Sequence, residues 1–138
     1  MNKIGVDTNV FIYAFVAESD YQTQSENFLQ YARETLFTTT KNISEFIAVC
    51  SKLNIPYPDI LNFIKEIKQH VVILFPDEKS LEKFEELITK YHPQGNRVYD
   101  IEIVSILKTN NINKLATFNI RDFKDIEEVQ LIDMDDFK

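Results

Sequence analysis

Scarce residue types exclude several classes of site in this sequence. It has one cysteine, so Cys50 cannot form an internal disulfide, which agrees with a reducing cytoplasm. Its two glycines, Gly5 and Gly95, cannot build a GxGxxG motif or a glycine-rich phosphate loop. Its two histidines, His70 and His92, have no ligand spacing, and without a second cysteine a structural zinc site is excluded.

Long hydrophobic segments, repeats and linkers are also missing. No apolar run approaches the roughly 20 residues that cross a bilayer, so no membrane association is expected. The N-terminus, MNKIGVD, lacks the apolar core of a secretion signal, which predicts a cytoplasmic protein. No stretch rich in Gly, Pro or Ser divides the chain. The 138 residues therefore predict a single domain, 1–138, that is large enough to bury a core.

Positive charge is in short supply, because 15 basic residues face 22 acidic ones and the formal net charge is −7. A protein that binds nucleic acid mainly through charge is normally basic. If this chain handles a polyanion, a divalent cation or a basic partner protein must supply positive charge locally. An acidic surface that only aids solubility fits the same balance, so composition leaves both interpretations open.

Hydrophobic periodicity predicts short strands that alternate with amphipathic helices. The run VVILF is apolar throughout, which indicates a strand buried on both faces, and the helix after Pro58 is expected to turn Leu61, Ile64 and Ile67 inward. This alternation is typical of an α/β fold, with helices on both faces of a mostly parallel central sheet. Strands are expected at 3–6, 35–39, 71–75, 114–118 and 129–133, and helices at 9–17, 21–33, from about 42, from about 58, at 77–91 and at 97–108.

Four acidic residues follow the expected strands or begin the expected helices, in apolar surroundings: Asp7, Glu45, Asp100 and Asp122. Ligands of parallel sheets collect at the carboxyl ends of the strands, and Asp7 directly follows the first strand. A single acid in the first turn of a helix gains about 0.3–1 kcal/mol from the helix dipole, so any one of them can be a capping charge. Four acids that converge repel one another unless a cation is present, and oxygen ligands suit Mg²⁺ or Mn²⁺.

Four segments that carry these acids resemble the successive motifs of the PIN-domain family, in particular its VapC-type toxins: IGVDTNVFIYAF, NISEFIAVC, GNRVYDIEIVSIL and LATFNIRDF. The resemblance implies a Rossmann-like three-layer α/β/α sandwich. It also implies an Mg²⁺- or Mn²⁺-dependent endoribonuclease whose products end in a 5′-phosphate and a 3′-hydroxyl.

The resemblance also assigns roles to individual residues. Asp7, Glu45 and Asp100 match the three principal catalytic and metal-binding acids, and Asp122 matches a less constant fourth. The polar positions that support them are matched by Asn9, Thr117 and Asn119. The fourth metal position lies between Asn119 and Asp122, and we favour Asp122. The family often has a small residue after the third acid, so no role is transferred to Glu102.

Further residues beside these motifs are expected to assist the site. Thr8 or Asn9 would fix the orientation of a carboxylate or of a water that it holds. Candidate contacts to RNA phosphates are Lys41, Arg97 and Arg121.

The resemblance further implies the toxin of a type II, VapBC-like toxin–antitoxin pair that acts as a homodimer and is silenced by a VapB-like antitoxin. Early aromatic residues, Phe11, Tyr13, Phe15 and Tyr21, are candidates to line the groove for that partner. Two alternatives stay open, namely an RNA-processing nuclease without an antitoxin and a catalytically silent interaction module of the same fold. A haloacid-dehalogenase-like phosphohydrolase is disfavoured because its second aspartate, two residues after the first, is Asn9 here. A response-regulator receiver is disfavoured because its phosphorylated aspartate follows a central strand.

Overall fold

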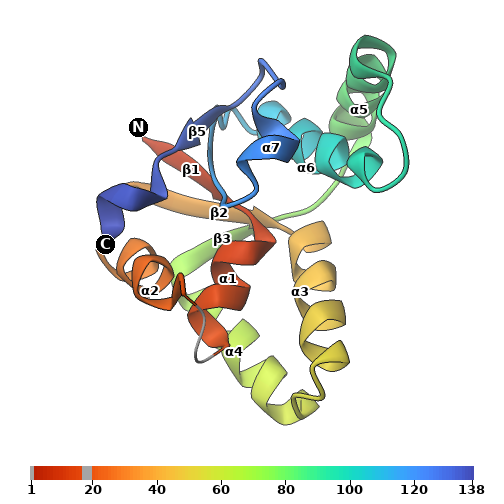
Figure 1. The fold of residues 1–138 in the computed structure, drawn as a ribbon. Coiled ribbons are helices and arrows are strands. Elements are labelled where there is room, and N and C mark those ends of the chain that lie inside the picture. The colour runs from red at the N-terminus through yellow and green to blue at the C-terminus, as the bar shows by residue number, and fades with distance from the viewer. Residues whose placement is uncertain (1, 17–19) are drawn as a thin grey trace.

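A single parallel sheet runs through the centre of the protein (Figure 1). The computed structural model describes residues 2–16 and 20–138. Within them the strands lie in the order β3-β2-β1-β4-β5, and every neighbouring pair is parallel. The strands are β1 (Lys3–Val6), β2 (Thr35–Thr39), β3 (Val71–Leu74), β4 (Lys114–Ala116) and β5 (Gln130–Ile132).

Helices connect the strands and close the chain. They are α1 (Thr8–Phe15), α2 (Gln22–Tyr31), α3 (Thr40–Lys52), α4 (Tyr57–His70), α5 (Glu78–Tyr91), α6 (Arg97–Thr109), the short α7 (Ile120–Phe123) and the 3₁₀ helix η1 (Met134–Phe137). None of the helices in the described part of the chain is long and apolar enough to cross a membrane. The sequence pattern did not predict α7 or η1, because four residues are too few to establish a helical period.

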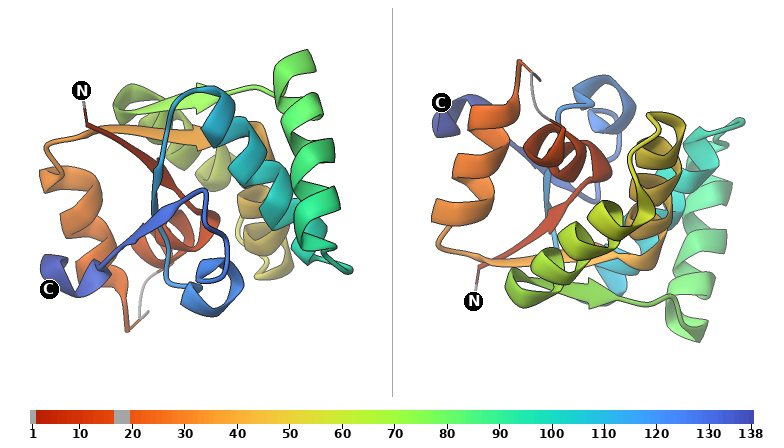
Figure 2. Two further views of the ribbon diagram at one scale, coloured as in Figure 1. Left: turned by 90° about the horizontal axis from the view of Figure 1, so that it is seen from above. Right: turned by 90° about the horizontal axis from the view of Figure 1, so that it is seen from below.

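Helices cover both faces of the sheet, as Figure 2 shows from two sides. Alternate strand residues enter two separate cores, because successive side chains of a strand point to opposite faces. Ile4, Val6 and Leu36 join the core that is packed by α1 to α4, and Leu115 joins the core that is packed by α5 to α7. The predicted three-layer α/β/α sandwich is therefore confirmed.

The expectation that the strand at 71–75 is buried on both faces is wrong. β3 lies at one edge of the sheet, and its Val71 is buried in the core packed by α1 to α4 while the next residue points to the opposite face. Val72 is 47% exposed, and Phe75, which follows the strand, is 70% exposed. In α4 the inward face is formed by Ile60, Ile64 and Ile67, whereas Leu61, which was expected inside, is exposed. Apolar composition alone does not distinguish an edge strand from a central one.

Gly5 allows α6 to approach the middle of the sheet. A Cβ atom at Gly5 would lie 2.8 Å from Cδ1 and 2.9 Å from Cδ2 of Leu107, which is itself buried in the core under α6. Gly5 therefore leaves room for a large side chain on the facing helix. Gly5 is the only small residue of β1, and it lies where the strand packs most closely against Leu107.

Replacing Gly5 with alanine is expected to destabilise the protein by about 1–3 kcal/mol, because an overpacked core must shift. Urea unfolding followed by circular dichroism measures this change. A Gly5→Ala/Leu107→Ala double variant should lose less stability than the sum of the two single variants, because the second change removes the clash. Additive losses would show that the close approach of Leu107 carries no energetic cost.

The strand order reverses between β1 and β4, and a ligand crevice is expected at their carboxyl ends. From β1 the chain proceeds to β2 and β3 on one side, and then returns to β4 and β5 on the other. Such a reversal separates the helices that cover neighbouring strands, and ligands of α/β proteins bind at this point. Asp7 follows β1 and Thr117 follows β4, and the Asp7 backbone N donates to the Ala116 carbonyl over 2.9 Å. The crevice therefore begins at Asp7.

Candidate active site

Asp7 is a buried carboxylate held by four hydrogen bonds. It is 5% exposed and caps the N-terminus of α1 by accepting from the Thr8 backbone N over 2.9 Å at Oδ1. Oδ1 also accepts from Asn42 Nδ2 over 3.2 Å. Oδ2 accepts from Thr117 Oγ1 over 2.7 Å and from Asn9 Nδ2 over 3.3 Å. Burial raises the pKa of Asp7 above its ordinary value, and hydrogen bonds from Thr117, Thr8 and Asn42 offset part of that rise.

The residues that follow β4 are tied to Asp7 through Asn9 and Thr117. Asn9 Nδ2 donates to Thr117 Oγ1 over 3.2 Å, and Asn9 Oδ1 accepts from the Phe118 backbone N over 3.1 Å. The predicted strand at 114–118 ends earlier, at Ala116, which leaves the Thr117 hydroxyl bonded to Asp7. Asn119 takes part through its backbone N, which donates to Thr117 Oγ1 over 3.0 Å, while its side chain makes no cap bond to α7.

Glu45 and Asn42 reach the crevice from α3, which begins where β2 ends. Glu45 is exposed on this helix, yet its pKa is raised, first by partial burial of the carboxyl and then by the charge of Asp7. A hydrogen bond from the Thr8 side chain opposes this rise. Asn42 is fully enclosed and bonds to Asp7, and the sequence reasoning missed it. The spacing of Thr39 and Asn42, typical of a helix cap, was the available signal.

Asp100 and Asp122 complete the group of acids from the other side. Asp100 lies in the first turn of α6 and Asp122 lies on α7, which packs against α6. The pKa of Asp100 is raised from 3.8 to about 7, first by burial of the carboxyl and then by the charges of Asp7, Asp122 and Glu45. The Arg97 guanidinium opposes it only weakly. The fold therefore brings all four predicted acids within electrostatic reach of one another.

The four acids repel one another without forming a closed cage of ligands. Across residues 2–16 and 20–138, no three Asp, Glu, His or Cys side chains lie close enough to hold one metal ion together. The pKa values of Asp7, Glu45 and Asp100 are raised rather than lowered, so the Arg97 guanidinium beside Asp100 does not offset burial and the charges of the other acids. Such a donor set fits a hard divalent cation held by one or two carboxylates and by water, which is typical of Mg²⁺.

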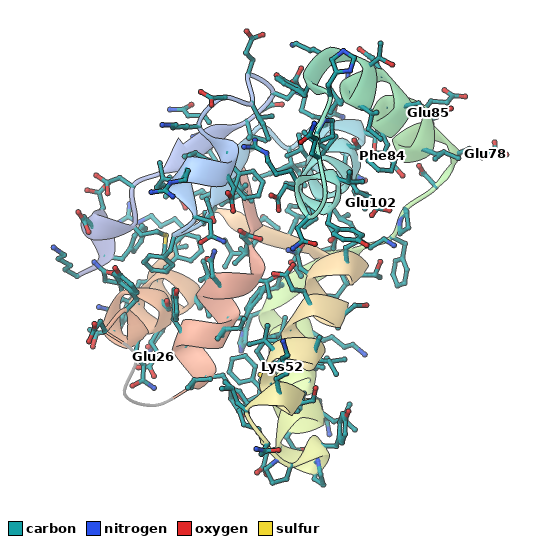
Figure 3. The ribbon with its side chains drawn as sticks, turned by 45° about the vertical axis from the view of Figure 1, so that its right-hand side comes forward. Glu26, Lys52, Glu78, Phe84, Glu85 and Glu102 are labelled. Atoms are coloured by element: carbon teal, nitrogen blue, oxygen red, sulfur yellow. The ribbon has the colours of Figure 1, made fainter. Side chains whose placement is uncertain are left out.

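The three basic residues predicted to contact RNA lie on helices that carry the acids, and two of them have partners within the chain. Figure 3 shows Glu102 on α6, and its Oε2 lies 3.4 Å from Lys41 Nζ at the start of α3. Arg97 Nη2 donates to the backbone carbonyl of Asp122 over 2.9 Å, which ties α6 to α7. Arg121 is exposed on α7. Contact of these residues with RNA stays a prediction.

A separate groove lies away from the acids, between α1, α2, α4 and β3. It encloses about 670 Å³, and apolar residues such as Phe11, Leu29 and Ile67 line it together with the acidic Glu26 and Glu66. Of the four early aromatic residues, Phe11 lines this groove and Phe15 lines a smaller neighbouring one. Tyr13 and Tyr21 instead pack against the Phe118 ring, at centroid distances of 5.2 and 4.7 Å.

Comparison with known proteins supports the resemblance found in the motifs. A family model described as "PIN domain" matches residues 4–129. No curated protein sequence matches the chain. Solved structures share the fold, and the three described next are each less than a quarter identical to this chain in sequence.

Three of these structures illustrate the similarity. VapBC2 from Rickettsia felis, bound to a DNA fragment of its promoter, has a TM-score of 0.73 and 22% identity, with 94% of this chain and 97% of that chain covered. VapBC-1 from nontypeable Haemophilus influenzae has a TM-score of 0.72 and 22% identity, with coverages of 96% and 98%. VapC20 from Mycobacterium tuberculosis, a toxin that cleaves the sarcin-ricin loop, has a TM-score of 0.67 and 11% identity, with coverages of 81% and 86%.

Proposed function

Because this chain belongs to the PIN domain family, we propose that it is an Mg²⁺- or Mn²⁺-dependent endoribonuclease and the toxin of a VapBC-like pair. One observation carries this proposal most directly. The pKa of Asp100 is raised to about 7, with three other acids from different segments contributing to the rise. A fold that gathers like charges in its ligand crevice loses stability by doing so, and a functional site explains that arrangement.

Asp7 and Asp100 are the residues that would hold the cation, with help from Glu45 and Asp122. When bound, the cation supplies Lewis-acid stabilisation of the charge that develops on the scissile phosphate. The Asp7 side chain is already oriented by four donors, so its position changes little when substrate arrives. The pKa of Asp100 is about 7 in the cation-free chain, so binding of the cation would release the proton of this carboxyl below that pH.

The remaining residues of the site would orient the RNA strand and the attacking water. Glu45 and Asp122 flank the crevice and can accept hydrogen bonds from that water, which attacks the phosphate in line with the leaving oxygen. Lys41, Arg97 and Arg121 lie on the helices that carry the acids and would contact neighbouring phosphates, which requires Lys41 to leave Glu102. When the 3′ oxygen is the leaving group, this cleavage gives a 5′-phosphate and a 3′-hydroxyl.

An antitoxin partner and a homodimer belong to the same proposal. Two of the solved structures described above are VapBC complexes, which supports a VapB-like partner for this chain. The groove between α1, α2 and α4 has apolar walls and two glutamates, so it suits a segment with apolar and basic side chains. We place this pair in the cytoplasm, where its RNA substrate would be found.

The proposal is tested with the purified chain and an end-labelled single-stranded RNA. Cleavage is expected in Mg²⁺ or Mn²⁺, and EDTA should abolish it until the cation is restored in excess. Analysis of the product ends should show 5′-phosphates and 3′-hydroxyls. RNA that stays intact in both cations would favour the catalytically silent module, and cleavage that persists in EDTA would contradict the role of the cation.

A further inference from the structure

Asn42 joins the start of α3 to Asp7, although 34 residues of sequence separate them. It occupies the third position of α3 and is 1% exposed. Its Nδ2 donates to Asp7 Oδ1 over 3.2 Å and to Thr8 Oγ1 over 2.9 Å. Its Oδ1 accepts from the Thr39 backbone N over 3.2 Å and from Thr39 Oγ1 over 2.7 Å. One amide therefore contacts the cap of α3 on one side and the end of β1 on the other.

The hydrogen-bonding capacity of this amide is completely used. A carboxamide offers two N–H donors and two acceptor lone pairs on its oxygen, and each of the four has a partner here. The donors face Asp7 and Thr8, and the acceptors face Thr39. A carboxylate cannot supply the donors, and a shorter hydroxyl cannot reach both sides, so asparagine is the side chain that makes the whole connection.

The hydrogen bond from Asn42 joins two segments whose carboxylates, Asp7 and Glu45, repel each other. Glu45 lies on the same helix as Asn42, one turn further along, and the charge of Asp7 raises the pKa of Glu45. Asn42 donates to Asp7 and carries no charge itself, so it attracts the Asp7 carboxylate without adding to the repulsion. It thereby holds the helix that carries Glu45 beside the strand end that carries Asp7.

The cap of α3 alone does not require an amide. In α5 the same capping box is formed by Asp77 and Ser80, where the Asp77 backbone N donates to Ser80 Oγ over 2.8 Å. A serine at the third position therefore completes this cap within the same protein. The Nδ2 of Asn42, which serine lacks, is the part that reaches Asp7 and Thr8.

We propose that Asn42 is a positioning residue of the active site, which orients the Asp7 carboxylate and sets its separation from Glu45. This inference rests on the proposed function, because it assigns Asn42 a role in the same cation-dependent cleavage. Asn42 is 1% exposed, so its side chain is enclosed by the protein and is not open to a substrate. Its effect passes through Asp7, as with hydrogen-bonding partners of metal ligands generally.

Asn42→Ser tests the proposal, because serine can keep the cap of α3 while the donors to Asp7 are lost. The variant is expected to lower kcat for a single-stranded RNA about 10–100-fold with KM changed less than about twofold, and to weaken Mn²⁺ binding about 10–100-fold without RNA. Electron paramagnetic resonance of free Mn²⁺ measures the binding. Asn42→Asp is the second variant, for use if Asn42→Ser fails to fold. It keeps the size of the side chain and its acceptors for Thr39 but lacks the donors to Asp7 and Thr8, so it should lower kcat as well.

Ser80→Ala is the matched control. It breaks the equivalent cap in α5, so it should lower the urea midpoint while leaving kcat and Mn²⁺ affinity as in the wild type. Wild-type kcat in both Asn42 variants, or wild-type Mn²⁺ affinity in Asn42→Ser, would overturn the positioning role. An equal loss of kcat in Ser80→Ala would overturn it as well, by attributing the effect to general stability. A wild-type chain that neither binds Mn²⁺ nor cleaves RNA would overturn the proposed function and this inference together.

Discussion

Replacing Asp7 with asparagine is expected to lower the rate of RNA cleavage by about 10³-fold or more while the chain stays folded. A bound cation contributes several kcal/mol to the stabilisation of the transition state, and about 4 kcal/mol corresponds to that factor. Asparagine caps helices as well as aspartate does, so the bonds from the Thr8 backbone and from Asn42 can persist. The bonds that Oδ2 accepts from Thr117 Oγ1 and Asn9 Nδ2 are lost, because an amide nitrogen cannot accept them, so a moderate loss of stability is expected beside the loss of cleavage.

The Asp7 experiment compares initial rates on labelled RNA with circular dichroism of the same samples. Asp59→Asn is the control, because it makes the same charge change at an exposed position on α4, away from the crevice. It should cleave at the wild-type rate. An Asp7→Asn chain that is folded and cleaves RNA as fast as the wild type would refute the assignment of the site.

Replacing Asp100 with asparagine is expected to stabilise the cation-free protein while abolishing cleavage. In the folded chain Asp100 keeps its proton up to pH about 7, whereas its ordinary pKa is 3.8. The folded state thus binds more protons than the unfolded state between pH about 4 and 7, so the free energy of unfolding falls as pH rises through this range. Asparagine stays neutral and avoids this loss, which is on the order of 1–2 kcal/mol after allowance for solvent screening.

Urea unfolding at several pH values between 4 and 8 measures the difference. Asp100→Asn should exceed the wild type in stability most at pH 8 and least near pH 4. Circular dichroism is the suitable signal because the chain has no tryptophan. Saturating Mn²⁺ should reduce or reverse the difference, because the cation stabilises the wild type through its binding energy. A stability gap that does not change with pH would show that Asp100 is not ionised against the charges of its neighbours.

The position of Asp7 could be predicted from the sequence, because the end of a buried strand in a parallel sheet is where ligands collect. Glu45, Asp100 and Asp122 could be grouped with it through helix starts and through the family motifs. The contact of Asn42 with Asp7 could not be predicted, because it depends on β1 and β2 lying side by side.

Strand order also limits what the pattern reveals about burial. The segment of Val72 is more apolar than that of Leu36, yet Val72 is exposed, because β3 lies at the edge of the sheet and is buried on the face of Val71 but not at Val72 on the other face. Strand length was overestimated where the backbone after β4 turns to bring the Thr117 hydroxyl to Asp7. In each case a long-range contact overrides the local preference.

The two separate cores have a consequence for how the site can fail. Asp7 and Glu45 are carried by helices that pack on one face of the sheet, while Asp100 and Asp122 are carried by helices that pack on the other. A small slide of one helical layer across the sheet would change the spacing between the two pairs of carboxylates without breaking any helix. Substitutions deep in either core can therefore abolish RNA cleavage while the secondary structure remains intact.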